Sequence, residues 1–244
     1  MGLDEMKKKY IAAAWLGAML LGGCSKESSN PAPTAPKRKD AQGLTAIQHA
    51  PANDTASPDY IPLKSGRQLV GLYWAWAKRH VDYDDAANVL YQKYGAEKND
   101  LLRDNMLKDL KPEIDAEIGK ARNVQYLVLE PDNASAWIGN YDAEYKHFPL
   151  TTMSGASTNY SFNDVPGYTL SFNNPHAFSR FDVADPALVE KVEKLKRNFA
   201  IGIKMYVHIT GAQPGTNVLE ADIQKVELLG PNNVVLGALT SSPR

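Results

Sequence analysis

Cysteine is nearly absent from this sequence, which has a single one, Cys24, in 244 residues. One thiol cannot form a disulfide within the chain, so the folded part must be stabilised by packing. An excess of either charge is also missing, since 27 basic and 28 acidic residues give a net charge of −1. Such a balance creates no strong field for a polyanion, and we expect no nucleic-acid partner.

Signatures of catalysis, metal binding and phosphate binding are missing too. The five histidines never form HxH or HxxxH pairs, so a zinc site would need His147, His176 and His208 to converge with a carboxylate. Neither a GxSxG nucleophile elbow nor a Gly-rich phosphate loop is present. We therefore predict no catalytic residue, no metal and no cofactor. Whether the chain is an enzyme stays open, although the missing motifs favour a non-enzymatic protein.

The start of the chain carries the three-part pattern of a secretory signal. A basic patch, Lys7 to Lys9, precedes the uncharged run Tyr10 to Leu21, and the small residues Gly22-Gly23 follow. The run has about a dozen residues, whereas a bilayer span needs about 20. Acidic residues before Met6 dilute the basic patch, so whether Met1 or Met6 is the true start stays open.

The residues Leu21-Gly22-Gly23-Cys24 resemble the lipobox of bacterial lipoproteins. The resemblance implies that residues 1-23 are a lipoprotein signal peptide and that Cys24 becomes the lipidated first residue of the mature protein. Each buried CH₂ of its acyl chains contributes about 0.8 kcal/mol to membrane anchoring. Ser25 stands where many inner-membrane lipoproteins have Asp, which favours the outer membrane, facing the periplasm, in a Gram-negative host. The alternative is an ordinary signal peptide that leaves Cys24 as a free thiol.

Residues 24-59 are rich in Pro, Ala, Ser and Thr and contain hardly an apolar cluster. Such a composition cannot bury enough surface to offset its ordering entropy, so we predict a flexible tether behind the lipidated Cys24. Its PKRK run is either a solvated linker or a contact with anionic headgroups. We expect residues 60-244 to form one folded unit.

Residues 60-123 show the spacing of helices. One helix is expected after Ser65, a second after Asp82 and a third after Asn99, because each of these side chains can cap a helix N-terminus. Gly95 is expected to end the second helix, and Pro112 to break or restart the third. The two tryptophans of the first helix are interpreted as core residues.

Residues 124-244 consist of short β-branched or aromatic runs, SAWIGNYD among them, which are separated by turn residues as in a β-rich segment. A further helix is expected after Asp185, with Pro186 at its first position, and GPNN before Val234 predicts a hairpin. The predicted fold class is α+β, with N-terminal helices followed by a mainly antiparallel β-sheet with one further helix. This half, including NYDAEYKHFPL, resembles functionally uncharacterised envelope-lipoprotein domains. The resemblance assigns no active-site residue.

Aromatic and amide side chains are concentrated between Asn159 and Phe181. Flat apolar rings beside hydrogen-bonding amides are suited to a glycan or peptide groove. Strands also favour aromatic residues and their turns favour Asn, so an ordinary sheet is the competing interpretation. The candidate ligand-binding residues are Tyr160, Phe162, Asn163, Tyr168, Phe172 and Asn173.

The main hypothesis is a lipid-anchored, non-enzymatic cell-envelope protein that serves as a binding or assembly factor. Its partners would be the membrane, through the N-terminal lipid, and an envelope protein or a cell-wall component. One alternative is an envelope hydrolase whose site is assembled only in the fold, with Ser154, Asp142 and Glu144 as the residues to test. The other is a periplasmic glycan or small-molecule binder that uses the Asn and aromatic residues.

Overall fold

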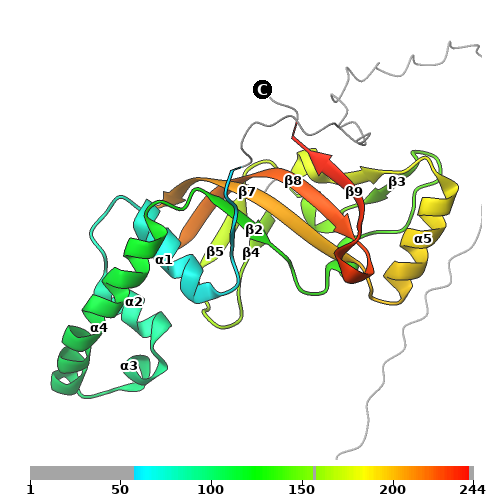
Figure 1. Cartoon of the computed structure of the whole chain (residues 1–244). Coiled ribbons are helices and arrows are strands. Elements are labelled where there is room, and N and C mark those ends of the chain that lie inside the picture. The colour runs from blue at the N-terminus through cyan, green and yellow to red at the C-terminus, as the bar shows by residue number, and fades with distance from the viewer. Residues whose placement is uncertain (1–57, 156–157, 242–244) are drawn as a thin grey trace, which may run out of the picture. The chain divides into compact units, whose positions relative to one another are not determined.

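The structure, a computed structural model, describes residues 58–155 and 158–241 (Figure 1). All of them belong to one compact unit, Gln42–Arg244. The predicted signal peptide, the lipidation site Cys24 and all but the last two residues of the predicted tether lie outside the described residues. The α+β class is confirmed, because helices come first, a mainly antiparallel sheet follows, and one helix interrupts the strands. No helix in this part of the chain has the length and the apolar character needed to cross a membrane.

Helices fill most of the segment that precedes the long strands. They are α1 (Gly66–Trp76), α2 (Tyr83–Leu90), α3 (Gln92–Ala96) and α4 (Asp100–Ala121). The side chains of Ser65, Asp82 and Asn99 each accept a hydrogen bond from a backbone N–H of the first turn, at 3.3, 3.0 and 3.1 Å. The three predicted helix starts are therefore confirmed, since each cap satisfies an N–H group that has no partner within its helix.

Two predicted helix ends are wrong. The second helix does not reach Gly95, because Tyr91 takes an extended backbone (φ −130°, ψ 96°) that separates α2 from α3. Pro112 does not break the third helix, since α4 continues through it. Pro112 lies on the exposed side of α4, so the Lys108 carbonyl, which loses its N–H partner to the proline ring, can bind water instead.

The main sheet has seven strands in the order β1-β2-β7-β8-β5-β4, with β9 also paired to β8. The strands are β1 (Ile61–Pro62), β2 (Tyr126–Leu129), β4 (Thr158–Tyr160), β5 (Thr169–Phe172), β7 (Gly202–Gln213), β8 (Val218–Leu229) and β9 (Val235–Thr240). The pairs β1–β2 and β5–β8 are parallel, and the others are antiparallel. The hairpin predicted at GPNN is confirmed as the β8–β9 turn, where Asn232 and Asn233 take positive φ.

The long strand β8 shares one of its edges between two partners. Residues Val218–Ala221 pair with β5, and residues Lys225–Leu229 pair with β9. In the gap between them, Asn174 Nδ2 donates to the Ile223 carbonyl at 2.9 Å, and Asn174 Oδ1 accepts from the Ile223 N–H at 2.8 Å. The Asn174 amide thus takes the place of a missing strand residue beside the fully buried Ile223.

One hydrophobic core joins the helices to the inner face of the sheet. The buried positions alternate along β7 as predicted, at Ile203, Met205, Val207 and Ile209. Tyr73 of α1 is fully buried, and its hydroxyl donates to the Gln213 carbonyl at 3.3 Å and accepts from the Gly215 N–H at 3.1 Å. These contacts hold α1 against the β7–β8 turn, so the helical and β-rich segments share their packing.

A smaller antiparallel sheet pairs β3 (His147–Pro149) with β6 (Arg180–Asp182). The helix that follows, α5 (Pro186–Arg197), begins as predicted, because Asp185 accepts a hydrogen bond from the Ala187 N–H at 2.9 Å. The stretch SAWIGNYD does not form the expected strand, since Ala134–Trp137 is a 3₁₀ helix. Its Ser135 hydroxyl exchanges hydrogen bonds with the Ile201 backbone at 3.3 and 3.2 Å, which turns the chain where a strand would continue.

Candidate functional site

The two edges of the main sheet line one pocket, which we call the edge cleft. Residues of β1 and β2 form one side, and residues of β4 and the segment after it form the other. The edges meet because the sheet curves (Figure 1), and the β7–β8 ladder has register shifts at Tyr206/Val207 and at Ile209/Gly211 that favour such bending. The cleft has a volume of about 410 Å³, within the ~300–1,000 Å³ of ligand pockets.

An aromatic pair forms one wall of the edge cleft. The rings of Tyr160 and Phe162 meet edge to face, with their centroids 5.1 Å apart and an interplanar angle of 89°. Both side chains are half-buried, so part of each ring stays open to a ligand. Burial raises the pKa of Tyr160, and the nearby Asp132 carboxylate adds to the rise. The phenol therefore keeps its proton and can both donate and accept a hydrogen bond.

Two lysines and two carboxylates line the cleft beside the aromatic pair. Lys204 Nζ lies 2.9 Å from Glu130 Oε1, and the glutamate side of this ion pair is more than half exposed. Lys64 and Asp132 complete the set, and both are exposed. An exposed ion pair contributes only about 0–1 kcal/mol to stability, so a ligand can bridge or displace this one at little cost to the fold. The four formal charges cancel.

A contact outside the cleft ties its two sides together. Both carboxylate oxygens of Asp164, in the segment after β4, accept from the Gly66 N–H at 2.9 and 3.1 Å. Gly66 is the first residue of α1, which follows β1 directly. A Cβ at Gly66 would lie 2.6 Å from Val165 Cβ, so only glycine permits this close approach. The contact fixes the segment after β1 against the segment after β4.

Two of the six predicted ligand-binding residues, Tyr160 and Phe162, lie in the edge cleft. Asn163 follows them on the exposed surface and does not line the cleft. The cleft also contains Glu130 and Lys204, which the sequence analysis did not identify as site residues. No local pattern marks them, because they reach the site from strands that are distant in the chain.

The other three predicted residues lie elsewhere. Tyr168 and Phe172 are fully buried in the core, where a surface ligand cannot reach them. Asn173 sits at the end of β5, and its Nδ2 donates to Thr210 Oγ1 at 3.0 Å and to Asp222 Oδ1 at 3.1 Å. The signal that could have separated Tyr168 and Phe172 from Tyr160 is the period of two that starts just before β5, because Tyr168, Leu170 and Phe172 all face the core.

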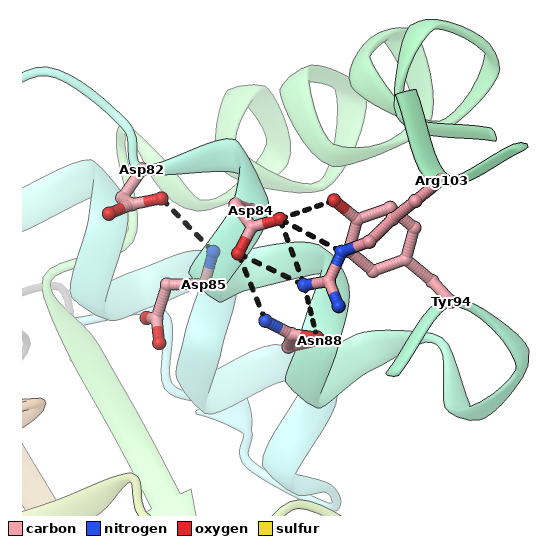
Figure 2. Close-up of polar contacts among 6 residues, drawn as sticks. All are labelled: Asp82, Asp84, Asp85, Asn88, Tyr94 and Arg103. Atoms are coloured by element: carbon pink, nitrogen blue, oxygen red, sulfur yellow. Dashed lines mark hydrogen bonds and ion pairs between the residues drawn. The ribbon is translucent and has the colours of Figure 1, made fainter. Parts of the chain in front are cut away.

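A polar network joins α2, α3 and α4 (Figure 2). Arg103 Nη2 lies 3.0 and 3.1 Å from the two carboxylate oxygens of Asp84 and donates to Asn88 Oδ1 at 2.9 Å. The buried Tyr94 donates its hydroxyl hydrogen bond to Asp84, and the Arg103 guanidinium lies 4.6 Å above the Tyr94 ring. The hydrogen bond from Tyr94, together with Arg103, lowers the pKa of Asp84. We interpret the network as packing between helices, since its members satisfy one another.

The neighbouring carboxylates of Asp82 and Asp85 also serve the fold. Asp82 caps α2, as the sequence predicts. Asp85 accepts a hydrogen bond from the Tyr168 hydroxyl at 2.8 Å, which links α2 to the start of β5. Burial and this hydrogen bond raise the pKa of Tyr168, so its hydroxyl remains a donor.

The residues named for the hydrolase alternative make local contacts. The Ser154 hydroxyl donates to the Thr151 carbonyl at 2.7 Å. The Asp142 carboxylate accepts from the N–H groups of Glu144 and Tyr145, each at 3.0 Å. Among residues 58–155 and 158–241, no three His, Cys, Asp or Glu side chains gather closely enough to hold a metal ion. Ser154 and Asp142 stabilise turns in this arrangement.

Comparison with known proteins adds no assignment to these observations. The chain matches no protein-family model, no curated protein and no solved structure. The edge cleft is therefore interpreted from its own geometry and chemistry.

Proposed function

We propose that this chain is a lipid-anchored protein of the bacterial cell envelope that binds a ligand in the edge cleft without chemically transforming it. The lipobox-like residues that end at Cys24 support the anchor, and the Pro-rich stretch behind it supports a tether. The observation that carries the binding role is the Tyr160–Phe162 pair, which stands beside paired charges in a pocket of ligand size.

The chemistry of the cleft fits a neutral ligand that has an apolar face and many hydroxyl or amide groups. A strongly charged ligand would meet like charge, because the cleft holds two lysines and two carboxylates. A saccharide can lay the C–H face of a ring on Phe162 or Tyr160 while its hydroxyls donate to Glu130 and accept from Lys204. A cell-wall glycan is therefore the ligand class that we favour.

Titration calorimetry with oligosaccharides of N-acetylglucosamine tests this function. The unit Gln42–Arg244 contains the whole described core, so it can be used without the N-terminal segment. We expect saturable binding, and Phe162→Ala should weaken it by about tenfold or more, since aromatic anchors dominate binding energy. Tyr145→Ala is the matched control, because Tyr145 is 66% exposed and lies outside the cleft.

Circular dichroism and thermal unfolding establish that each variant is folded before its affinity is compared. Equal affinity of the wild type and Phe162→Ala would contradict the cleft as the binding site. Binding to a cell-wall peptide with no binding to the oligosaccharides would keep the cleft and reassign its ligand.

A further inference from the structure

Phe199 is the most exposed large hydrophobic residue in the described part of the chain, with 83% of its surface open. It follows the C-terminus of α5, where its N–H donates to the Lys196 carbonyl at 3.0 Å and the Ala200 N–H donates to the Leu195 carbonyl at 2.9 Å. This pair of hydrogen bonds defines a Schellman motif, which places Phe199 at the position where glycine is usual.

The backbone at Phe199 confirms that a bulky side chain is unfavourable there. Its φ of 52° lies in the left-handed region, which strains any residue that has a Cβ and is uncommon for an aromatic one. The ring gains no packing in return, because it is almost fully exposed. Phe199 therefore destabilises the fold. Residues held in such a strained backbone conformation are often found at functional sites.

The β8–β9 hairpin lies beside this end of α5 (Figure 1). The Leu195 side chain packs against Gly230, where β8 ends, since a Cβ at Gly230 would be 3.5 Å from Leu195 Cδ1. The hairpin exposes Val234 and Val235, with 54% and 52% of their surfaces open. We call Phe199, Val234 and Val235 the apolar tip, because they lie at the end of the sheet where β7 and β9 begin and β8 ends: Gly202 pairs with Leu229, and Leu229 pairs with Val235.

Positive charge borders the apolar tip. The last turn of α5 carries Lys194, Lys196 and Arg197. Lys196 is occupied, because its Nζ donates to the Gly139 carbonyl and to Asn140 Oδ1, both at 2.8 Å. Lys194 and Arg197 are exposed, and neither takes part in an ion pair among the described residues. They are therefore placed to meet an anionic surface.

We propose that the apolar tip inserts into the interfacial region of a lipid bilayer, with Lys194 and Arg197 against anionic headgroups. Exposed aromatic and aliphatic side chains flanked by cations are the combination that binds membrane surfaces. A protein partner fits less well, since a stable interface buries about 800 Å² on each side and one aromatic residue supplies about 150–250 Å². This proposal goes beyond the binding role of the edge cleft and does not depend on it.

A fluorescent label at the tip tests the insertion directly. The unit Gln42–Arg244 has no cysteine, so Val234→Cys accepts one nitrobenzoxadiazole group at a single exposed site and keeps the Phe199 ring. With vesicles of phosphatidylcholine and phosphatidylglycerol, we expect a blue shift and a rise in emission, both weaker with phosphatidylcholine alone. Leu101→Cys is the control, because Leu101 is 70% exposed in the first turn of α4 and should show no response.

The unlabelled variant Phe199→Gly separates insertion from folding. We expect it to unfold at a higher denaturant concentration than the wild type, because it relieves the strained backbone. Its partition onto anionic vesicles should fall by about tenfold or more, since an apolar ring no longer enters the bilayer. Phe162→Ala should partition like the wild type, so failure of the tip proposal and failure of the cleft proposal are distinguishable.

Three results would overturn the proposal. The first is no response of the label at position 234 to either vesicle, and the second is an equal response at positions 234 and 101. The third is a response at position 234 to envelope protein without any response to lipid, which would assign the tip to a protein partner.

Discussion

Asn174 is the residue whose removal most sharply tests how the sheet is held together. Its amide makes two hydrogen bonds to the backbone of Ile223, at 2.9 and 2.8 Å, at the point where β8 passes from β5 to β9. Asn174→Ala removes both bonds and leaves a donor and an acceptor on a residue that is fully buried. On this edge of β8 neither β5 nor β9 reaches that position, so the protein has no second partner to offer.

The magnitude follows from the two groups that lose their partner. A buried polar group left without a hydrogen bond costs about 1–3 kcal/mol. Asn174 is half-buried, so water entering the space it leaves would relieve part of this cost. We therefore expect Asn174→Ala to lower the free energy of unfolding by about 2–4 kcal/mol, a large fraction of the ~5–15 kcal/mol of a typical domain.

Urea unfolding followed by circular dichroism measures this loss, and the adjacent Asn173→Ala is a matched control. Asn173 donates to the side chains of Thr210 and Asp222 at the surface, where water can replace it. Its loss should be below about 1 kcal/mol. A change of less than about 0.5 kcal/mol for Asn174→Ala, or equal losses for both variants, would refute the bridging role.

Two further predictions concern charge and anchoring. Asp84→Asn should destabilise the protein at pH 7 and less so as the pH falls below about 4. The pKa of Asp84 is lowered in the folded state, so its carboxylate stabilises the fold above the unfolded-state pKa, and this stability is lost on acidification. A difference in urea midpoint that does not change with pH would contradict this prediction. Cys24→Ser should release the full-length chain from the membrane fraction and remove the acyl mass seen by mass spectrometry. Equal membrane retention of the variant and the wild type, with no acyl mass on the wild type, would argue against the lipobox interpretation.

Much of the fold could be predicted because its signals are local. Ser65, Asp82 and Asn99 cap their helices through side chains that bind within one turn, and β7 shows its buried face through alternation alone. The prediction that Pro112 breaks the helix was wrong, since the cost of a proline inside a helix depends on whether water can reach the carbonyl that it leaves free. That exposure is a tertiary property and is not contained in the local sequence.

The candidate site was predicted only in part, for the same physical reason. Tyr160 and Phe162 belong to a conspicuous aromatic stretch, but Tyr168 and Phe172 of that stretch pack inward. Lys204 joins the site because β7 pairs with β2 and so places it beside Glu130, although the two strands are distant in the chain. Tyr160 faces them because the sheet curves, and curvature depends on register shifts that no local pattern predicts. The sequence shows that Phe199 follows a helix with a basic C-terminal turn. Only its left-handed backbone and its exposure, which the structure shows, mark it as a candidate functional residue.

The most direct test of the central claim is a crystal structure of the Gln42–Arg244 unit bound to an N-acetylglucosamine oligosaccharide. We predict a sugar ring against Phe162 or Tyr160, with hydroxyl groups at hydrogen-bond distance from Glu130 or Lys204. An oligosaccharide bound elsewhere on the protein, or an empty edge cleft at a saturating concentration, would contradict the account.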